Sequence, residues 1–400
     1  MLQRKNNKIW PICIVSFCWS TASMMVTCVL PVYLTEQLHV GYAKIGYLEG
    51  TVIFCAFITK VFSGILSDYL RKRHLLILIG SILGIITKPM LAIANTYSLV
   101  LLARFIDRFA KGIRSAPTDA LIADLNPNTL NYAFGLRQAI YILGAVFGAV
   151  LSILIMFLIG QRYNIIFYIA VIPAILAVII LCLFVKDNNT KLIAKKKFKL
   201  NFSDFKKFPI YYWAILVITF FLMIARFSES FLSLKVKQFG WPIFWLPLII
   251  IISDLSHSLF AFLTRNFATK MAGEKLLFCG LIILIIANIT WLFANNNLML
   301  IVAIILTGMH LGVTQGILRT LIAMSSLHIN PNINGTAFSL FYLVSGCGVF
   351  IGNLIAGLLA EKFWLSSIFI GGTIASSIAL LLLLGIKFHQ KKLNRSLMIF

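Results

Sequence analysis

The sequence predicts an all-α integral membrane protein with twelve transmembrane helices in two pseudo-symmetric six-helix bundles. Of its 400 residues, 60% are hydrophobic and only 12% are charged, against about 45–50% and 25% in soluble domains. Apolar segments of about 20 residues, long enough to cross the hydrocarbon core of a bilayer, recur along the chain. A polar, lysine-rich linker at 186–209 separates six of them in residues 1–185 from six in residues 210–400.

Hydropathy predicts the spans one by one, with short polar breaks between them. The first apolar run begins at Ile9 and exceeds the hydrophobic region of a signal peptide, which measures about 7–15 residues. It also lacks a small-residue cleavage site, so we interpret it as a retained helix. The predicted spans cover residues 9–34, 45–67, 75–94, 97–122, 133–159, 163–185, 210–233, 242–264, 276–294, 298–322, 335–360 and 364–386.

Basic residues divide unevenly between the two sides of the predicted membrane. The formal net charge is +23, yet most of the basic residues lie in loops between apolar spans, which argues against nucleic-acid binding. They gather near both termini, at Arg71, Lys72 and Arg73, and in the linker. The positive-inside rule therefore places both termini and the linker in the cytoplasm. We expect the linker to act as a topology anchor, with lipid-headgroup binding as the alternative.

The two halves of the sequence are weakly similar when one is shifted by 204 residues. The matched glycines are Gly112 with Gly316, Gly144 with Gly348, and Gly148 with Gly352. Together with the six-plus-six span count, these matches indicate parallel repeats, which place a solute site between the halves.

The fourth predicted span carries an unusual number of charges. Each Arg, Lys or Asp at membrane depth costs roughly 2.5–3.5 kcal/mol on insertion scales. At about 100° per residue the charged side chains fall within an arc of roughly 140°, which predicts one face turned towards an aqueous cavity. The charged residues are Arg104, Asp107, Arg108, Lys111, Arg114 and Asp119.

Other intramembrane polar residues are spaced for pairing. Arg226 and Glu229 are three residues apart in span 210–233 and are expected to share a face, either as a structural ion pair or in coupling. Asp254 and His257 repeat this spacing, as a buried hydrogen-bonded pair or a proton relay. Glu49 lies near the outer end of its span, where it is either solvated or functional.

Two motifs are similar to those of the major facilitator superfamily. The residues GILSDYLRKR at 64–73 resemble its G-x-L-x-D-R-x-G-R-R signature, with Tyr69 and Arg71 as departures. The residues DRFAKGIRSAPTDALIAD at 107–124 resemble the D-R-x-G-K-G-I-R-x-A-P-R-D-A-L pattern of a bacterial subset of facilitators, with two departures. Arg104 resembles the arginine of the family's motif in that helix.

The resemblance implies a secondary active transporter in a bacterial inner membrane, working as a monomer by alternating access. Because intramembrane cations outnumber acids, we expect a small anionic or zwitterionic solute, with protons or another ion for coupling. The alternatives are a drug or metabolite efflux antiporter and a non-transporting sensor on the same scaffold. Neither G-x-x-x-x-G-K-[ST] nor H-E-x-x-H occurs, so we expect no enzyme activity, cofactor or metal site.

Three groups of residues follow from these arguments. Arginine offers a planar fork of donors to an anion, and lysine adds charge; the expected substrate contacts are Arg104, Arg108, Lys111 and Arg226. Asp107 is held ionised by its cationic neighbours, so the expected proton-coupling residues are Glu229, Asp254 and Glu49. The resemblance implies a cytoplasmic latch, in which Arg71 or Arg73 pairs with Asp119 or Asp124; its residues are Gly64, Asp68, Arg71, Arg73 and Asp119.

Overall fold

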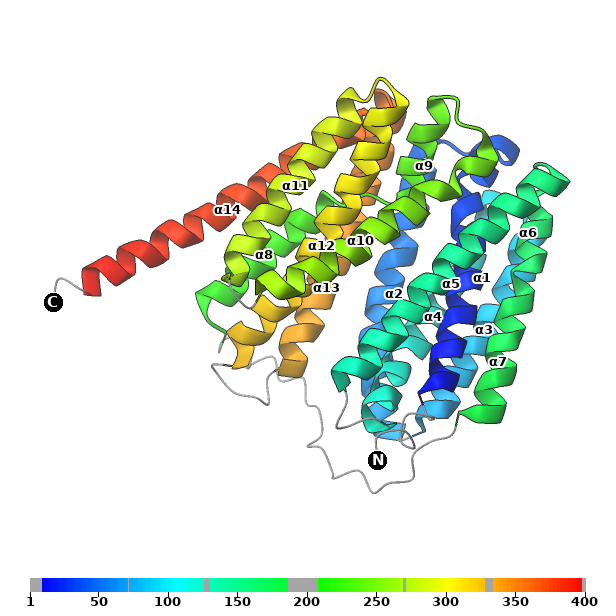
Figure 1. Ribbon diagram of the computed structural model, residues 1–400, viewed down its shortest axis with the longest axis horizontal. Helices are drawn as coiled ribbons and strands as arrows, with labels where there is room; N and C mark the ends of the chain where they lie inside the picture. The colour runs from blue at the N-terminus through cyan, green and yellow to red at the C-terminus, as the bar shows by residue number, and fades with distance from the viewer. Residues whose placement is uncertain are drawn as a thin grey trace. The chain divides into compact units, whose positions relative to one another are not determined.

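The computed structural model describes residues 9–70, 72–125, 130–185, 208–268, 271–327 and 334–397, and these are helical with short connections. Figure 1 shows the helices in chain order. In the first half they are α1 (Trp10–Val32), continued by a π-helical turn (Tyr33–Gln37), α2 (Tyr42–Leu70), α3 (Arg73–Ala92), α4 (Tyr97–Leu125), α5 (Leu130–Ile159), α6 (Tyr163–Ile169) and α7 (Val171–Phe184). In the second half they are α8 (Ile210–Ile224), α9 (Glu229–Gln238), a 3-10 turn (Ile243–Trp245), α10 (Pro247–Ala268), α11 (Gly273–Phe293), α12 (Asn297–Leu327), α13 (Asn334–Lys362) and α14 (Ser367–Leu397).

The predicted all-α membrane architecture is confirmed. Eleven of the described helical segments are long and apolar enough to cross a membrane by length and composition. The remaining long helix is α4, whose 29 residues carry the charges found in the sequence. Two predicted spans are each built from two helices, α6 with α7 and α8 with α9. The linker predicted at 186–209 lies outside the described residues except for its last two.

The chain forms two compact units that follow the two halves but exchange short segments. Unit 1 comprises residues 1–41, 51–197 and 229–251, and unit 2 comprises residues 42–50, 198–228 and 252–400. Thus the start of α2 belongs with the second-half helices, and α9 belongs with the first-half helices. Within unit 2, the start of α2 packs against α13, where a Cβ on Gly357 would lie 2.7 Å from the carbonyl oxygen of Tyr42.

Helix packing repeats between the two units. In unit 1, α1 contacts α5 and α7, and α3 contacts α4 and α7; in unit 2, α8 contacts α13 and α14, and α11 contacts α12 and α14. The shift of 204 residues holds for the packing glycines of α5 and α13. Gly144 and Gly148 meet the backbone of α1, as Gly348 and Gly352 meet the backbone of α8. Small residues allow helices to approach closely, which favours their association in a bilayer, where the hydrophobic effect does not drive helices together.

The predicted match between Gly112 and Gly316 is wrong. Gly112 packs against Thr59 of α2, whereas a Cβ added at Gly316 would meet no neighbouring helix within 4 Å. The structural counterpart is Gly312, 200 residues after Gly112, which packs against His257 and Ala261 of α10. The offset differs because the segments from α4 to α5 and from α12 to α13 differ in length.

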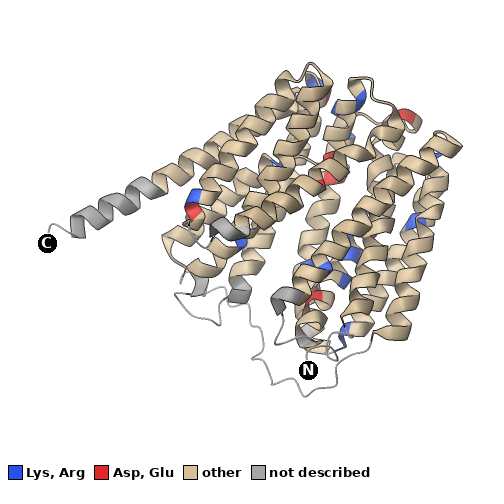
Figure 2. Ribbon diagram, in the orientation of Figure 1, with Lys and Arg blue, Asp and Glu red and all other residues tan. Residues whose placement is uncertain are grey.

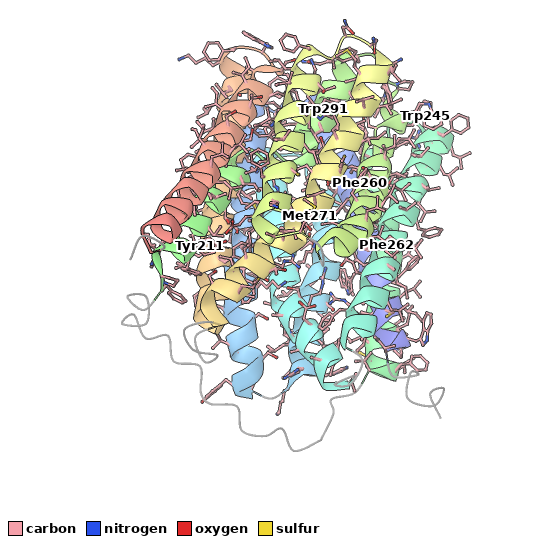
Figure 3. The ribbon with its side chains drawn as sticks, turned by 60° about the vertical axis from the view of Figure 1, so that its left-hand side comes forward. Tyr211, Trp245, Phe260, Phe262, Met271 and Trp291 are labelled. Carbon is pink, nitrogen blue, oxygen red and sulfur yellow. The ribbon has the colours of Figure 1, made fainter. Side chains whose placement is uncertain are left out.

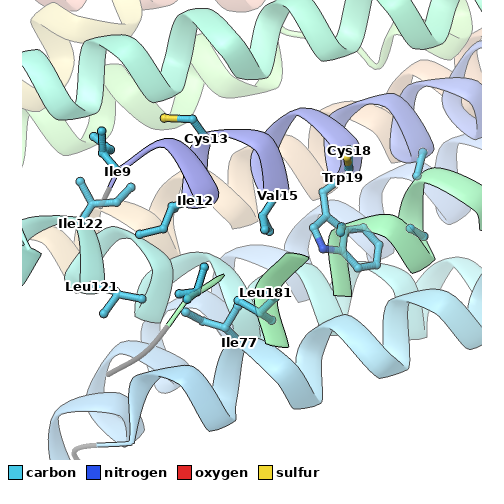
Figure 4. Packing of buried hydrophobic residues seen from close by; sticks show 14 of the residues in the cluster. Ile9, Ile12, Cys13, Val15, Cys18, Trp19, Ile77, Leu121, Ile122 and Leu181 are labelled. Atoms are coloured by element: carbon cyan, nitrogen blue, oxygen red, sulfur yellow. The ribbon is translucent and has the colours of Figure 1, made fainter. Parts of the chain in front are cut away.

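The interior of unit 1 is apolar at the end where α1 begins. Figure 4 shows Ile12, Val15 and Trp19 of α1 among side chains from α3, α4 and α7, including Ile77, Leu121 and Leu181, all of them buried. In unit 2, Trp291 of α11, labelled in Figure 3, stacks on Phe369 with ring centroids 5.5 Å apart. By contrast, Phe262 of α10 is 63% exposed, as expected for a side chain that meets lipid tails.

Candidate functional site

The charged face of α4 is supported by its neighbours. Pro117 has no N–H, so the carbonyl of Ile113 loses its usual intrahelical donor. Ser63 of α2 donates a hydrogen bond to that carbonyl instead. A nearby α2 contact is at Gly64, where a Cβ would lie 3.7 Å from Ala116. These contacts keep α4 helical through the proline and fix the direction of its charged side chains. Figure 2 shows how few other charges the helices carry between their ends.

Asp107 lies at the centre of a buried ion-pair network in unit 1. Its carboxylate accepts a hydrogen bond from the Lys88 ammonium at 2.6 Å and one from the Thr87 hydroxyl at 3.3 Å. The Arg104 guanidinium lies 3.9 Å from the other carboxylate oxygen. Lys88, Arg104 and Asp107 are each only 1–2% exposed. These side chains therefore form an internal network of ion pairs and hydrogen bonds between α3 and α4.

Arg108 and Lys111 occupy a less enclosed position on the same helix. Both are half-buried. The Lys111 ammonium donates to the Tyr141 hydroxyl of α5 at 3.4 Å. The Nε of Arg108 is buried and has no hydrogen-bond partner within the described chain, and no carboxylate forms an ion pair with Arg108 there. A buried donor without an acceptor destabilises a protein by about 1–3 kcal/mol, so a bound ligand that supplies an acceptor here would be stabilised.

Arg114 continues this face towards α1. Its guanidinium lies 3.6 Å from the ring centroid of Trp19, which is a close cation–π contact. A Cβ at Gly84 of α3 would come within 2.7 Å of its Nη1. Arg114 is therefore held between an aromatic ring and a helix backbone, and it adds positive charge beside Arg108 and Lys111.

Asp119 connects several helices of unit 1. Its carboxylate pairs with Arg137 of α5 and with Lys60 of α2, the latter at 3.6 Å. Arg137 also donates to Ser16 of α1 at 3.2 Å. The expected latch pairing of Asp119 with Arg73 is not among these contacts. Arg71 and the side chains of Asp68 and Asp124 lie outside the described residues.

Unit 2 has its own cationic group at the end of α8. Arg226 donates from Nε to the Nε2 of His310 at 3.0 Å, and from Nη2 to the hydroxyl of Thr314. The predicted Arg226–Glu229 pairing on one helical face is wrong, because α8 ends at Ile224 and α9 begins at Glu229. The backbone leaves the helix between them, and the N–H of Ser228 is satisfied by the Asn353 side chain at 2.9 Å.

The other predicted coupling residues differ in their surroundings. Glu49 is only 5% exposed, so the solvated interpretation is wrong. Asp254 is half-buried on α10, and its carboxylate has no hydrogen bond or ion pair within the described residues. Within the described part of the chain no hydrogen bond joins the Asp254 carboxylate to His257, so the expected hydrogen-bonded pair is not found there.

Sequence reasoning missed the partners that come from other helices. No partner for Lys88 was predicted from the sequence, although a lysine inside an apolar span indicates that an acidic side chain is buried nearby. His310 and Thr314 are four residues apart and therefore share a helical face, and this spacing could have indicated that they bind the same group. Nothing in the sequence indicated the contacts of Tyr141 and Trp19, because aromatic residues are common in membrane helices. No group of three metal-ligating side chains occurs among the described residues.

Comparison with known proteins identifies similarity over almost the whole chain. The Major Facilitator Superfamily model matches residues 12–326 and 255–397. An uncharacterised MFS-type transporter from Methanocaldococcus jannaschii is 27% identical over 375 residues, which cover 92% of each chain.

Solved transporter structures share the fold. The nucleoside transporter NupG aligns with a TM-score of 0.76 and 16% identity, over 95% of this chain and 98% of NupG. A POT family transporter in complex with 5-aminolevulinic acid aligns with a TM-score of 0.80 and 12% identity, over 96% of both chains. A bacterial homologue of the human lysosomal transporter Spinster, in an inward-facing and unoccupied conformation, gives 0.73 and 15%, over 96% of this chain and 95% of that chain.

Proposed function

Since the chain belongs to the major facilitator superfamily, whose members are transporters and not enzymes, we propose that it moves a small anionic or zwitterionic solute by alternating access, driven by protons. The family and fold support secondary transport. The class of solute and the coupling ion are our proposal.

The observation that carries the solute class is the excess of cations around α4. Three cationic side chains of α4, Arg104, Arg108 and Arg114, together with Lys88 of α3, surround a single buried carboxylate, Asp107. A membrane interior does not tolerate such an excess without anions or water. A lipophilic cation would be repelled by this surface, whereas the carboxylate or phosphate of an organic anion would be attracted.

Within this group, we assign the solute contact to Arg108 and Lys111. Arg104 is also one of the contacts expected from the sequence, but its side chain is 1% exposed and lies beside Asp107. Arg108 is half-buried with an unused donor, and Lys111 lies one turn along the same face. Arg108 offers the planar fork that matches an oxoanion, and Lys111 adds charge.

The test is a thermal-shift screen of the purified chain against small organic anions, zwitterions and cations, followed by transport of the hits in proteoliposomes. Binding to the folded state raises the melting temperature with ligand concentration. We expect the hits to be anionic or zwitterionic, and Arg108→Lys to weaken their binding by about 1–3 kcal/mol, the scale of a charge-assisted hydrogen bond.

Arg162→Lys is the matched control, because Arg162 is exposed and precedes α6, away from the charged face of α4. Its affinities should equal those of the parent chain. Hits confined to cations would refute the proposed solute class. Anionic hits whose affinity is unchanged by Arg108→Lys would move the contact to other residues.

A further inference from the structure

The guanidinium of Arg226 is docked by one edge onto α12. Its Nε and Nη2 donate to His310 and Thr314, which lie one turn apart on the same helical face. Nε–H and the neighbouring Nη2–H form the side edge of an arginine fork, so this edge is occupied by the protein. His310 and Thr314 are 1% and 0% exposed, which makes the arrangement rigid.

The hydrogen-bond roles in this cluster are fixed by chemistry. Arginine can only donate, so His310 accepts through Nε2, and its Nδ1–H must donate to the carbonyl of Gly280 at 2.8 Å. The Thr314 hydroxyl donates to the carbonyl of His310 at 2.8 Å, which leaves its lone pairs for Arg226. Both acceptors of Arg226 are therefore uncharged, and the positive charge is oriented but not neutralised.

The remaining donors of Arg226 have only a weak protein partner. Nη1 approaches the thioether sulfur of Met223 at 3.8 Å, and sulfur is a poor acceptor. Within the described residues no carboxylate forms an ion pair with Arg226, and the charge of Arg319 acts on it with the same sign. His257, on α10, is another ionisable side chain near Arg226.

We infer that the end of the Arg226 fork, formed by the outer N–H groups of Nη1 and Nη2, binds a carboxylate of the solute, with His310 and Thr314 as positioning residues. Two parallel N–H donors match the two oxygens of one carboxylate. This subsite rests on the proposed function and assigns it a chemical group, a carboxylic acid. It also gives His310 a role that requires the neutral ring.

The experiment titrates the purified full-length chain with sodium acetate against sodium chloride at constant ionic strength and follows the melting temperature. Acetate is expected to raise the melting temperature above the chloride value. Thr314→Val keeps the side-chain shape and removes the acceptor, so it should weaken acetate binding by roughly tenfold, the factor that corresponds to losing one net hydrogen bond. Arg226→Lys should abolish the effect.

Thr314→Ser retains the hydroxyl and is the matched control, with acetate binding expected within about twofold of the parent. His310→Gln keeps an acceptor for Nε and His310→Leu does not, so this pair repeats the test if Thr314→Val fails to fold. Absence of acetate stabilisation in the parent chain would overturn the inference, and so would unchanged stabilisation in both Thr314→Val and His310→Leu.

The same titration on Arg108→Lys separates this inference from the proposed function. If acetate stabilisation is lost in Arg108→Lys but kept in Thr314→Val, the carboxylate binds on α4 and the Arg226 subsite is refuted, while anion transport stands. If acetate stabilisation is kept in Arg108→Lys but lost in Thr314→Val, the Arg226 subsite is supported. The proteoliposome assay with Arg108→Lys then decides the role of α4 independently.

Discussion

Lys88 illustrates how much a single residue depends on its tertiary partner. The sequence shows a lysine followed by a proline near the end of an apolar helix, and the structure places its ammonium 2.6 Å from Asp107. Removing one member of a buried ion pair leaves an uncompensated charge in a medium of low dielectric constant. Such losses typically cost about 3–5 kcal/mol.

We therefore expect Asp107→Asn to destabilise the chain by about 3–5 kcal/mol, measured as reduced resistance to thermal denaturation in detergent. Adding Lys88→Met should recover part of this loss, because no unpaired ammonium then remains. Asp119→Asn is the control, since the Asp119 side chain is 37% exposed and ion pairs of that kind contribute about 0–1 kcal/mol. Equal losses of thermal stability in Asp107→Asn and Asp119→Asn would show that the buried Asp107 ion pair contributes no more stability than the partly exposed one.

Asp254 supports a prediction about coupling. A carboxyl group without a fixed cation can take up and release a proton without breaking an ion pair, and Asp254 is half-buried on α10 in such a state. We expect Asp254→Asn to abolish pH-driven accumulation in proteoliposomes while solute exchange continues. Glu274→Gln neutralises a carboxylate that accepts a hydrogen bond from Tyr211, and it should leave both pH-driven accumulation and solute exchange intact. Normal pH-driven accumulation by Asp254→Asn would assign coupling to Glu49, Glu229 or another ion.

At the scale of the helices, close approach between α1 and α5 depends on the absence of side chains. A Cβ at Gly148 would lie 2.5 Å from the carbonyl oxygen of Thr21, and backbone cannot move aside as a side chain can. We expect Gly148→Ala to destabilise the chain by about 1–3 kcal/mol through overpacking. Gly135→Ala, in the same helix with nothing within 4 Å, should have no such cost. A neutral Gly148→Ala in thermal unfolding would mean that the α1–α5 contact is more adaptable than its geometry indicates.

The break between α8 and α9 was not predicted, and the reason lies outside the local sequence. Residues 225–228 contain neither glycine nor proline, so hydropathy extended one helix through them. The break is stabilised by the side chain of Asn353, which accepts a hydrogen bond from the N–H of Ser228. A backbone donor released from a helix in the membrane needs an acceptor. Here the acceptor comes from a residue 125 positions away.

At the scale of the whole molecule, the distribution of basic residues predicts that both termini and the linker face the cytoplasm. A cysteine introduced at Lys191 should react with a membrane-impermeant maleimide only in inside-out vesicles, and a cysteine at Arg162 only in intact cells. Each is compared with the parent chain, whose own exposed cysteines are Cys182 and Cys279. The opposite labelling pattern would invert the proposed topology.

The sequence by itself determined the membrane class, the helical architecture, the six-plus-six organisation and the charged face of α4. These features depend on composition and on helical periodicity, which are local properties that the bilayer imposes on any chain. The pairing of polar groups was decided only by the tertiary structure. Asp107 forms an ion pair with Lys88 of α3, Asp119 forms one with Arg137 of α5, and Arg226 donates a hydrogen bond to His310 of α12. A buried polar side chain must find a partner, but several partners are chemically equivalent, and only helix packing determines which one lies within 3–4 Å.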